Sequence, residues 1–168
     1  MTAHARELRE AFDRGFAEAI SPQRFSHSDL LCIAVGGESY AIRIVDIASL
    51  HAGLRVVALP SRAPELLGVA AIRANVVPIY DLATALGLSG GAPPRWMVLH
   101  RAAQAGFAFE HHDGHVRIAD GSTSATSRRG HIVGQVPVDG RPRLVIDLDS
   151  VLTAIETRTN QSHPARKQ

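Results

Sequence analysis

The feature of this sequence that most constrains its fold is the stretch Leu66–Leu82, in which two short apolar runs flank a polar tip. The tip is Arg73-Ala74-Asn75, and the stretch closes on Pro-x-x-Asp-Leu with Asp81 before the final leucine. Short apolar runs on either side of a polar turn are typical of a β-hairpin. Asp81 stands where it can cap a short helix. The stretch therefore predicts a rigid hairpin with an arginine at its end.

The rest of the chain repeats this pattern of short apolar runs separated by Gly, Pro and other turn residues. We expect strands at 30–35, 40–44, 54–59, 68–73, 76–80, 95–100, 106–110, 115–118, 131–136 and 143–146, and short helices at 82–86 and 149–155. Residues 45–50 are expected to form one helical turn. Asp139-Gly140 is a strong signal for a type I′ turn. Many short strands with few helices predict a mainly β fold built of small barrels.

Glycine and proline concentrate at Gly87–Pro94, which is the clearest internal break in the chain. Such a stretch reads as a hinge or a crossover between two lobes. We find no repeat close enough in sequence to indicate a duplication.

The two ends of the chain differ in character from the rest. Residues 4–20 place Leu8, Phe12, Phe16 and Ile20 at intervals of four among charged residues, which predicts an amphipathic helix within an extension over 1–25. Its apolar stripe can pack on its own domain, on a partner or on a second copy of the chain, and these alternatives stay open. Residues 157–168 are polar and are expected to form a flexible tail.

Charge and hydropathy exclude several kinds of partner. The chain has 18 basic and 16 acidic residues and a formal net charge of +2, which is too small to favour nucleic acid or an acidic membrane surface. No uncharged apolar run approaches the roughly 18 residues that a membrane span needs. There is no signal-peptide pattern, so a cytoplasmic protein is expected. Cys32 is the single cysteine, and its apolar surroundings predict a buried, inert thiol.

Motifs for catalysis or for a cofactor are missing from the sequence. It contains neither a G-x-S-x-G elbow nor the G-K-[ST] of a phosphate loop, so neither Ser-His-Asp catalysis nor nucleotide binding is expected. His111-His112-Asp113-x-His115 has metal-ligand residue types and would need His100 or His131 to complete a site. Because Asp113-Gly114 is a turn signal, exposed turn residues are the better interpretation. We predict no metal site and keep a metal-binding sensor as a remote alternative.

Three segments together resemble the CheW-like domains, which are scaffolds that couple chemotaxis receptors to a histidine kinase. They are 40–47, 66–82 with the preceding Pro60-x-x-x-Pro64, and 134–152. The second segment is similar to the family signature GVxNLRGxxxPxxDL, and the third resembles the family's closing hairpin. Order and spacing agree across all three, so the resemblance covers about residues 28–156.

The resemblance implies both a fold and a function. The expected fold is mainly β, with two intertwined, five-stranded SH3-like barrel lobes and short helices. The expected function is that of a non-catalytic adaptor, with no cofactor. Its partners would be the regulatory domain of a CheA-type kinase and the cytoplasmic tip of a chemoreceptor, which places it in the cytoplasm at membrane-associated receptor arrays.

By the same resemblance, the family's binding arginine corresponds to Arg73, its rim valine to Ile47 and its motif glycine to Gly68. Ala74 and Asn75 complete the candidate partner-binding tip. A rigid tip suits an arginine, whose planar fork pairs with carboxylates. The alternatives are that Arg73 pairs with an aspartate inside the domain, Asp46 or Asp81, that Gly68 is a plain strand bulge and that Ile47 is ordinary core.

The chain departs from the family at three places. The glycine of NLRG is Ala74, so we expect Asn75 to take the left-handed conformation instead. A family acidic residue is Ser49 here, and the stretch 106–116 differs from the family's second-lobe strand. A diverged relative that binds one partner, or serves a non-chemotactic pathway, therefore remains an alternative.

Overall fold

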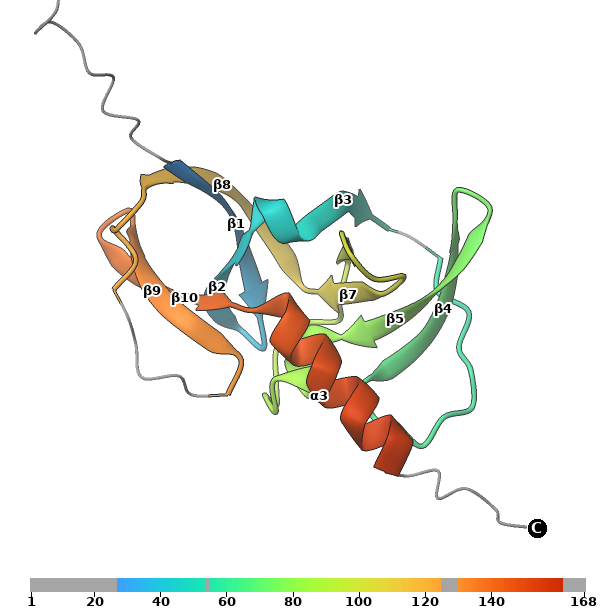
Figure 1. Ribbon diagram of the computed structural model, residues 1–168. Coiled ribbons are helices and arrows are strands. Elements are labelled where there is room, and N and C mark those ends of the chain that lie inside the picture. The colour runs from blue at the N-terminus through green and yellow to red at the C-terminus, as the bar shows by residue number, and fades with distance from the viewer. Residues whose placement is uncertain (1–26, 54, 125–129, 162–168) are drawn as a thin grey trace, which may run out of the picture.

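The computed structural model describes residues 27–53, 55–124 and 130–161, which form ten strands in two five-stranded sheets (Figure 1). The predicted helix at 4–20 lies outside the described residues. We call the first sheet with its helix lobe 1: β3 (Ile47–Ala52), β4 (Leu66–Ile72), β5 (Asn75–Asp81), β6 (Trp96–His100), β7 (Gly106–Phe109) and α2 (Leu82–Ala85). Lobe 2 comprises β1 (His27–Val35), β2 (Glu38–Arg43), β8 (His111–Ala119), β9 (Ile132–Val138), β10 (Arg141–Ile146) and α3 (Leu148–Gln161).

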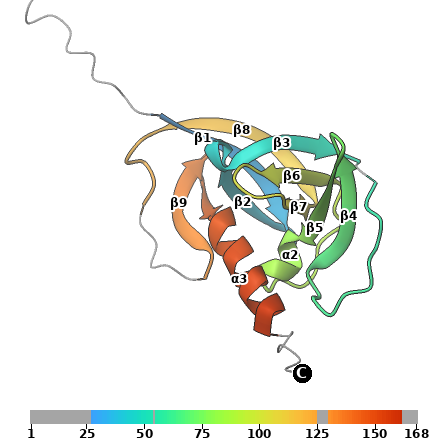
Figure 2. The same ribbon diagram turned by 45° about the vertical axis from the view of Figure 1, so that its right-hand side comes forward.

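The chain passes between the lobes twice, which makes them interwoven. The strand order is β3-β6-β7-β5-β4 in lobe 1 and β8-β1-β2-β10-β9 in lobe 2. The first crossing is the 3-10 turn η1 (Ile44–Asp46), and the second lies between β7 and β8 at Glu110. Figure 2 shows β9 on one side, β4 on the other and α3 between them. The mainly β fold with two intertwined five-stranded lobes is therefore confirmed.

The predicted lobe boundary at residues 87–94 is wrong. That segment joins α2 to β6, and both belong to lobe 1. A Gly- and Pro-rich stretch breaks secondary structure wherever it occurs, so its composition does not distinguish a linker from a loop inside one lobe.

Each sheet curls until the segment after one edge strand reaches the opposite edge. Val57, which follows β3, bridges to Val69 of β4, and Ser124, which follows β8, bridges to Gln135 of β9. Each sheet also contains a single parallel pair, β5 with β7 and β2 with β10. These shared features make the two lobes alike in topology.

Three local predictions need correction. The strand expected at 54–59 is absent from residues 55–59 apart from the bridge at Val57, and the strand lies earlier, as β3. The turn expected at Asp113-Gly114 is an irregularity within the continuous strand β8, where the pairing register shifts between Cys32 and Ile33. A bulge and a turn favour the same residue types, because both need residues that tolerate positive φ. α3 ends at Gln161 rather than Ile155, so its last turns occupy the start of the expected tail.

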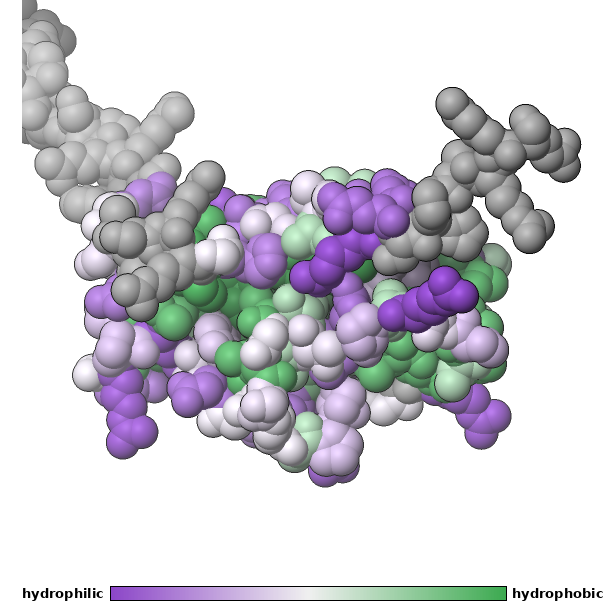
Figure 3. All heavy atoms as spheres, turned by 90° about the horizontal axis from the view of Figure 1, so that it is seen from below, coloured by the Kyte–Doolittle hydropathy of each residue, from purple (hydrophilic) through white to green (hydrophobic). Residues whose placement is uncertain are grey.

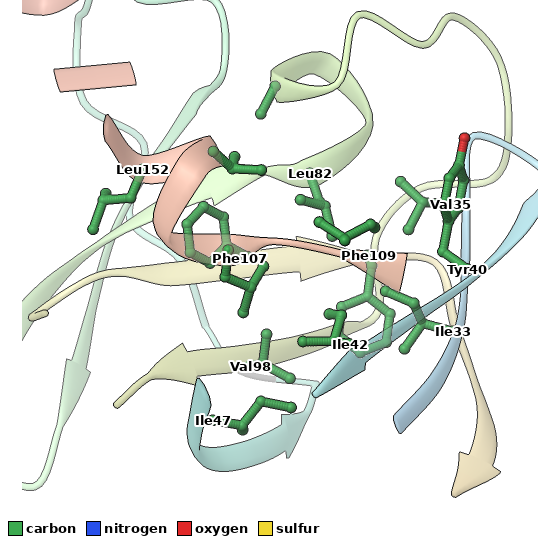
Figure 4. Close-up of a cluster of buried hydrophobic side chains, with 14 of the residues drawn as sticks. Ile33, Val35, Tyr40, Ile42, Ile47, Leu82, Val98, Phe107, Phe109 and Leu152 are labelled. Carbon is green, nitrogen blue, oxygen red and sulfur yellow. The ribbon is translucent and has the colours of Figure 1, made fainter. Parts of the chain in front are cut away.

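Hydrophobic clusters fill each lobe and the space between them. Along β1, Leu30 and Cys32 face the interior of lobe 2, whereas Leu31, Ile33 and Val35 face a core shared by both lobes. A strand buried on both faces is apolar at almost every position, as this run is. Figure 4 shows the shared core, with Ile33, Val35, Tyr40, Ile42 and Leu152 from lobe 2 and Ile47, Leu82, Val98, Phe107 and Phe109 on the side of lobe 1.

The α3 helix seals this shared core. It buries Leu148, Val151, Leu152 and Ile155, which recur at the spacing of one helix face. Each such side chain contributes about 1.5–3 kcal/mol when it leaves water. Among the described residues, no helix is both long enough and apolar enough to cross a membrane.

Cys32 lies in the interior of lobe 2, as the sequence predicts. It is 3% exposed, and burial raises the pKa of its thiol. Because the thiolate is the reactive form, this environment makes Cys32 a poor nucleophile.

Candidate partner-binding site

The β4–β5 hairpin ends in a two-residue turn made of Arg73 and Ala74. Ile72 pairs with Asn75 across the turn, and φ is 45° at Arg73 and 66° at Ala74. Positive φ at both central residues is the requirement of a type I′ turn, which Asn, Asp and Gly meet more easily than Arg or Ala. The expectation that Asn75 takes the left-handed conformation is therefore wrong. Strand pairing extends to Asn75, so only the two residues before it can make the turn.

Gly68 permits a close backbone approach at the base of this hairpin. Val57 and Val69 exchange two hydrogen bonds, with N···O distances of 2.8 and 2.9 Å. A Cβ atom at Gly68 would lie 2.7 Å from the carbonyl carbon of Val57 and 2.8 Å from Cα of Ala58, and φ of Gly68 is 145°. Gly68 is buried beneath that segment, which favours the structural alternative for this residue over direct contact with a partner.

Arg73 is exposed and pairs with no carboxylate among the described residues. Asp46 is engaged by Arg43, whose Nε lies 2.8 Å from the aspartate Oδ2. Asp81 caps α2, where it accepts from the backbone N of Thr84 over 3.3 Å and from its hydroxyl over 2.5 Å. Both aspartates that were candidates for an internal pair with Arg73 are thus occupied, so its guanidinium is available to a partner.

A groove extends from this tip to the loop between β6 and β7. Ile72, Arg73 and Val77 line it on the hairpin side, and residues 99–105 line it on the other. Its lining contains no Asp or Glu. Sequence reasoning found only the hairpin side, because the residues of the opposite wall belong to no motif.

Arg101 fixes that opposite wall. Its Nε donates to the carbonyl of Val45 over 2.6 Å, and its Nη2 donates to the carbonyl of Ile47 over 2.8 Å. The backbone N of Arg101 also donates to the carbonyl of Asp46 over 2.9 Å. Ile47 is 8% exposed and packs in the shared core, so its side chain is core and its carbonyl positions Arg101.

His100 supports the same loop from below. It is 5% exposed, and its Nδ1 accepts from the backbone N of Ala102 and Ala103 over 3.3 and 3.1 Å. With Nδ1 accepting, the proton of the neutral ring sits on Nε2. That atom lies 3.0 Å from Oδ1 of Asp149, without the alignment of a hydrogen bond. The loop is therefore held in shape by a buried neutral imidazole.

The fold gives other contacts to the histidines considered as metal ligands. Within residues 27–53, 55–124 and 130–161, no three or more His, Cys, Asp or Glu side chains gather so that they could hold a metal ion. The ring centroid of His112 lies 5.1 Å from that of Trp96. Asp113 accepts from an arginine of β10 over 2.8 Å, and Nδ1 of His131 lies 2.8 Å from the hydroxyl of Ser150. These contacts serve packing and sheet structure.

A second hollow lies between the loop at residues 60–64 and the end of α3. Glu65, 2% exposed, accepts at Oε1 from Nε and Nη2 of Arg158 over 3.2 and 3.0 Å. The pair ties α3 to lobe 1. The two residues are 93 positions apart, so no local sequence signal could have revealed the contact.

Large apolar side chains are exposed at a few places among the described residues: Val45 (64%), Val57 (57%), Leu59 (46%) and Val76 (66%). Val76 follows the hairpin tip, and the carbonyl of Val45 binds Arg101, but neither valine belongs to the groove lining. On the face shown in Figure 3, apolar residues form separate patches among hydrophilic ones. That face offers no single continuous apolar surface.

Comparison with known proteins gives one family and one fold. The sequence pattern of the CheW-like domain matches residues 29–156. No curated protein matches the chain. Among solved structures, it resembles the scaffolding protein TtCheW from Thermoanaerobacter tengcongensis, with a TM-score of 0.65 and 14% sequence identity over 71% of this chain and 88% of that one. At this identity, the structural likeness is evidence of the fold alone.

Proposed function

The chain belongs to the CheW-like domain family, and on this premise we propose that it is a non-catalytic adaptor that couples chemoreceptors to a CheA-type histidine kinase. The family match over residues 29–156 is the observation that carries the proposal. The fold likeness to a protein described as a scaffolding protein supports it.

In this proposal, the partners are the regulatory domain of the kinase and the cytoplasmic tip of the receptor. Arg73 is the central contact, since an exposed guanidinium that pairs with no carboxylate in the described part of the chain can pair bidentately with one from a partner. Ala74 and Asn75 complete the contact surface. Ile47 and Gly68 act from beneath by supporting the groove and the hairpin. Such an adaptor works in the cytoplasm, at membrane-associated receptor arrays.

A diverged adaptor, which binds one partner or serves a non-chemotactic pathway, is the second candidate. Ala74 replaces the family's glycine at the tip, and Ser49 replaces an acidic residue. The hydroxyl of Ser49 lies 2.8 Å from Nε2 of His51, so Ser49 makes a local contact. The alanine at position 74 leaves Arg73 in place and alters the residue next to it, which favours a change of partner over a loss of binding.

A binding assay with purified proteins tests both candidates. The full chain is mixed with the kinase regulatory domain and with a receptor signalling fragment, separately and together. Binding to both partners at once is the expected result for a coupling adaptor. Binding to one alone would establish the diverged form, and binding to neither would overturn the proposed function.

The same assay tests the role of Arg73. We expect Arg73→Glu to abolish binding to at least one partner, because the reversed charge repels the carboxylate that Arg73 pairs with. Thermal stability should stay near wild type, since Arg73 forms no ion pair with any residue that the structure describes. Arg141→Glu is the matched control, with the same charge change at an exposed position beside the other hairpin turn. An equal loss in both variants would remove the special role of the tip.

A further inference from the structure

The groove beside the hairpin tip holds two arginine side chains whose charge is not neutralised within the described residues. Arg73 lies on one wall and Arg101 on the other. Four other arginines pair with carboxylates at 2.8–3.0 Å: Arg43, Arg117, Arg143 and Arg158. The groove therefore brings two arginines without a carboxylate partner among the described residues to one place, in a lining that contains no Asp or Glu.

Arg101 is positioned in advance for a ligand. Its Nε and Nη2 donate to the carbonyls of Val45 and Ile47. A guanidinium has five N–H donors, so three remain. Carbonyl oxygens fix the orientation of the fork but do not cancel its charge. A carboxylate that binds the remaining donors would gain a charge-assisted hydrogen bond and would not have to order the side chain.

Apolar surface lies between and beside the two charges. Ile72, Val77 and Leu99 contribute to the lining. Apolar surface would gain nothing from a free phosphate or a nucleic-acid backbone. It fits a protein segment that carries both acidic and apolar side chains.

We propose that this two-arginine groove receives an acidic, amphipathic segment of a partner protein. One carboxylate of the segment pairs with Arg73, a second pairs with Arg101, and an apolar side chain between them packs on the groove floor. The inference rests on the proposed adaptor function and adds to it the chemistry of the partner and a second binding residue, Arg101.

Two synthetic peptides test the groove without a natural partner. One has glutamates on both sides of a leucine, and the other has glutamines in their place. Titrated into the isotope-labelled full chain, the glutamate peptide should shift the amide signals of Asn75 and of residues 101–105. The glutamine peptide should bind at least about tenfold more weakly, since it lacks the charge-assisted bonds. Equal binding of both peptides, shifts elsewhere or no binding would overturn the proposal.

Variants then assign the two carboxylate contacts. Arg73→Gln and Arg101→Gln should each weaken the glutamate peptide about tenfold, whereas Arg141→Gln should change binding less than about twofold. Because Arg101 also holds two carbonyls, Arg101→Lys serves as a second variant that keeps the charge but loses the fork. It should give an intermediate loss. Wild-type affinity in both Arg101 variants would remove this residue from the site.

The natural partners separate this inference from the adaptor function. If the wild-type chain binds the kinase domain or the receptor fragment and both Arg101 variants bind it equally well, the two-arginine groove is wrong and the adaptor function stands. If the chain binds neither natural partner, the adaptor function is wrong. The peptide titration then tests by itself whether the groove binds an acidic segment.

Discussion

The β4–β5 hairpin of lobe 1 and the β9–β10 hairpin of lobe 2 occupy equivalent places, each at the edge of its sheet and beside the parallel pair. Equivalent residues stand 66 positions apart in the chain. They are Gly68 and Gly134 at the bridges that close the sheets, Arg73-Ala74 and Asp139-Gly140 at the turns, and Asp81 and Asp147 before the helices.

The supporting contacts of the two hairpins are also equivalent. The backbone N of Asp81 donates to the carbonyl of Glu65 over 2.7 Å, and that of Asp147 donates to the carbonyl of His131 over 2.9 Å. Each aspartate then accepts from the backbone N three residues later. The local backbone scaffold is therefore the same in both lobes, and the two hairpins differ in their side chains, most informatively at the tips and the bases.

The tips differ in how well their residues suit the turn. φ is 50° at Asp139 and 74° at Gly140, and it is 45° at Arg73 and 66° at Ala74. Asp-Gly is a preferred type I′ pair, whereas Arg and Ala hold positive φ at a cost. The turn in lobe 2 therefore has the residues that favour its conformation. The strained choice in lobe 1 therefore teaches that its tip is not optimised for stability, which fits a tip that binds a partner.

Alanine in place of Gly68 or Gly134, the glycines at the two bridges, should give the largest difference in unfolding free energy between the two hairpins. Gly68→Ala should destabilise the protein by about 3 kcal/mol, because the new Cβ meets the backbone of Val57 and the φ suits only glycine. Gly134→Ala should cost less. The atom nearest to its added Cβ would be the methyl carbon of Thr123, at 2.5 Å, and that side chain can rotate away. Urea unfolding of both variants measures the difference. A larger loss for Gly134→Ala would contradict the assignment.

Loss of a side-chain contact at the base of each hairpin should lower the unfolding free energy by different amounts. Arg158→Ala leaves the buried Glu65 carboxylate without this partner and should cost about 2 kcal/mol. His131→Ala removes a neutral contact with Ser150 and should cost about 1 kcal/mol. Adding Glu65→Gln to Arg158→Ala should recover part of the loss. No recovery in that double variant, measured by thermal melting, would mean that the charge of Glu65 is not the cause.

Exchanging the tip residues should reverse the difference between the turns. Ala74→Gly should stabilise the protein by about 0.5–1 kcal/mol, and Gly140→Ala should destabilise it by a similar amount. Arg73 stays in place in the first variant, so partner binding can be measured on a relaxed tip. Equal unfolding free energies for wild type and Ala74→Gly would show that the turn in lobe 1 carries no strain.

The smallest expected effect is a pH dependence confined to lobe 2. Burial, together with repulsion from Arg158, lowers the pKa of His131 below its ordinary value near 6.5. The unfolded chain therefore takes up this proton at a higher pH than the folded chain, and stability falls as pH drops through that window. His131→Gln should show a smaller loss of unfolding free energy than wild type between about pH 7.5 and about pH 5.5. Equal losses would exclude His131 as the source.

Local sequence patterns predicted both hairpins. The features that these patterns did not predict depend on pairing between strands far apart in the sequence. Alternating apolar residues and the signal at Asp139-Gly140 depend on neighbours in sequence, and so does the cap at Asp81. The pairing of β1 and β2 with strands from the other end of the chain has no such signal, so the Gly- and Pro-rich loop at 87–94 was mistaken for the lobe boundary.

The candidate site shows the same limit. Arg73 was predicted from its motif, whereas Arg101 belongs to no motif and is one arginine among many in the sequence. The likeness of the two lobes was also hidden. Their shared glycine, turn and aspartate positions are few, and different side chains fill the positions between them.

The interwoven path of the chain has a consequence for synthesis on the ribosome. Lobe 1 has all its strands once Phe109 has emerged, but β1 and β2 are made first and must wait for β8, β9 and β10. During that interval, a hairpin that is apolar on both faces has no sheet to join. Nascent chains with such exposed strands are prone to aggregate and to engage chaperones. A product truncated near residue 110 would therefore carry a complete lobe 1 joined to an aggregation-prone remnant of lobe 2.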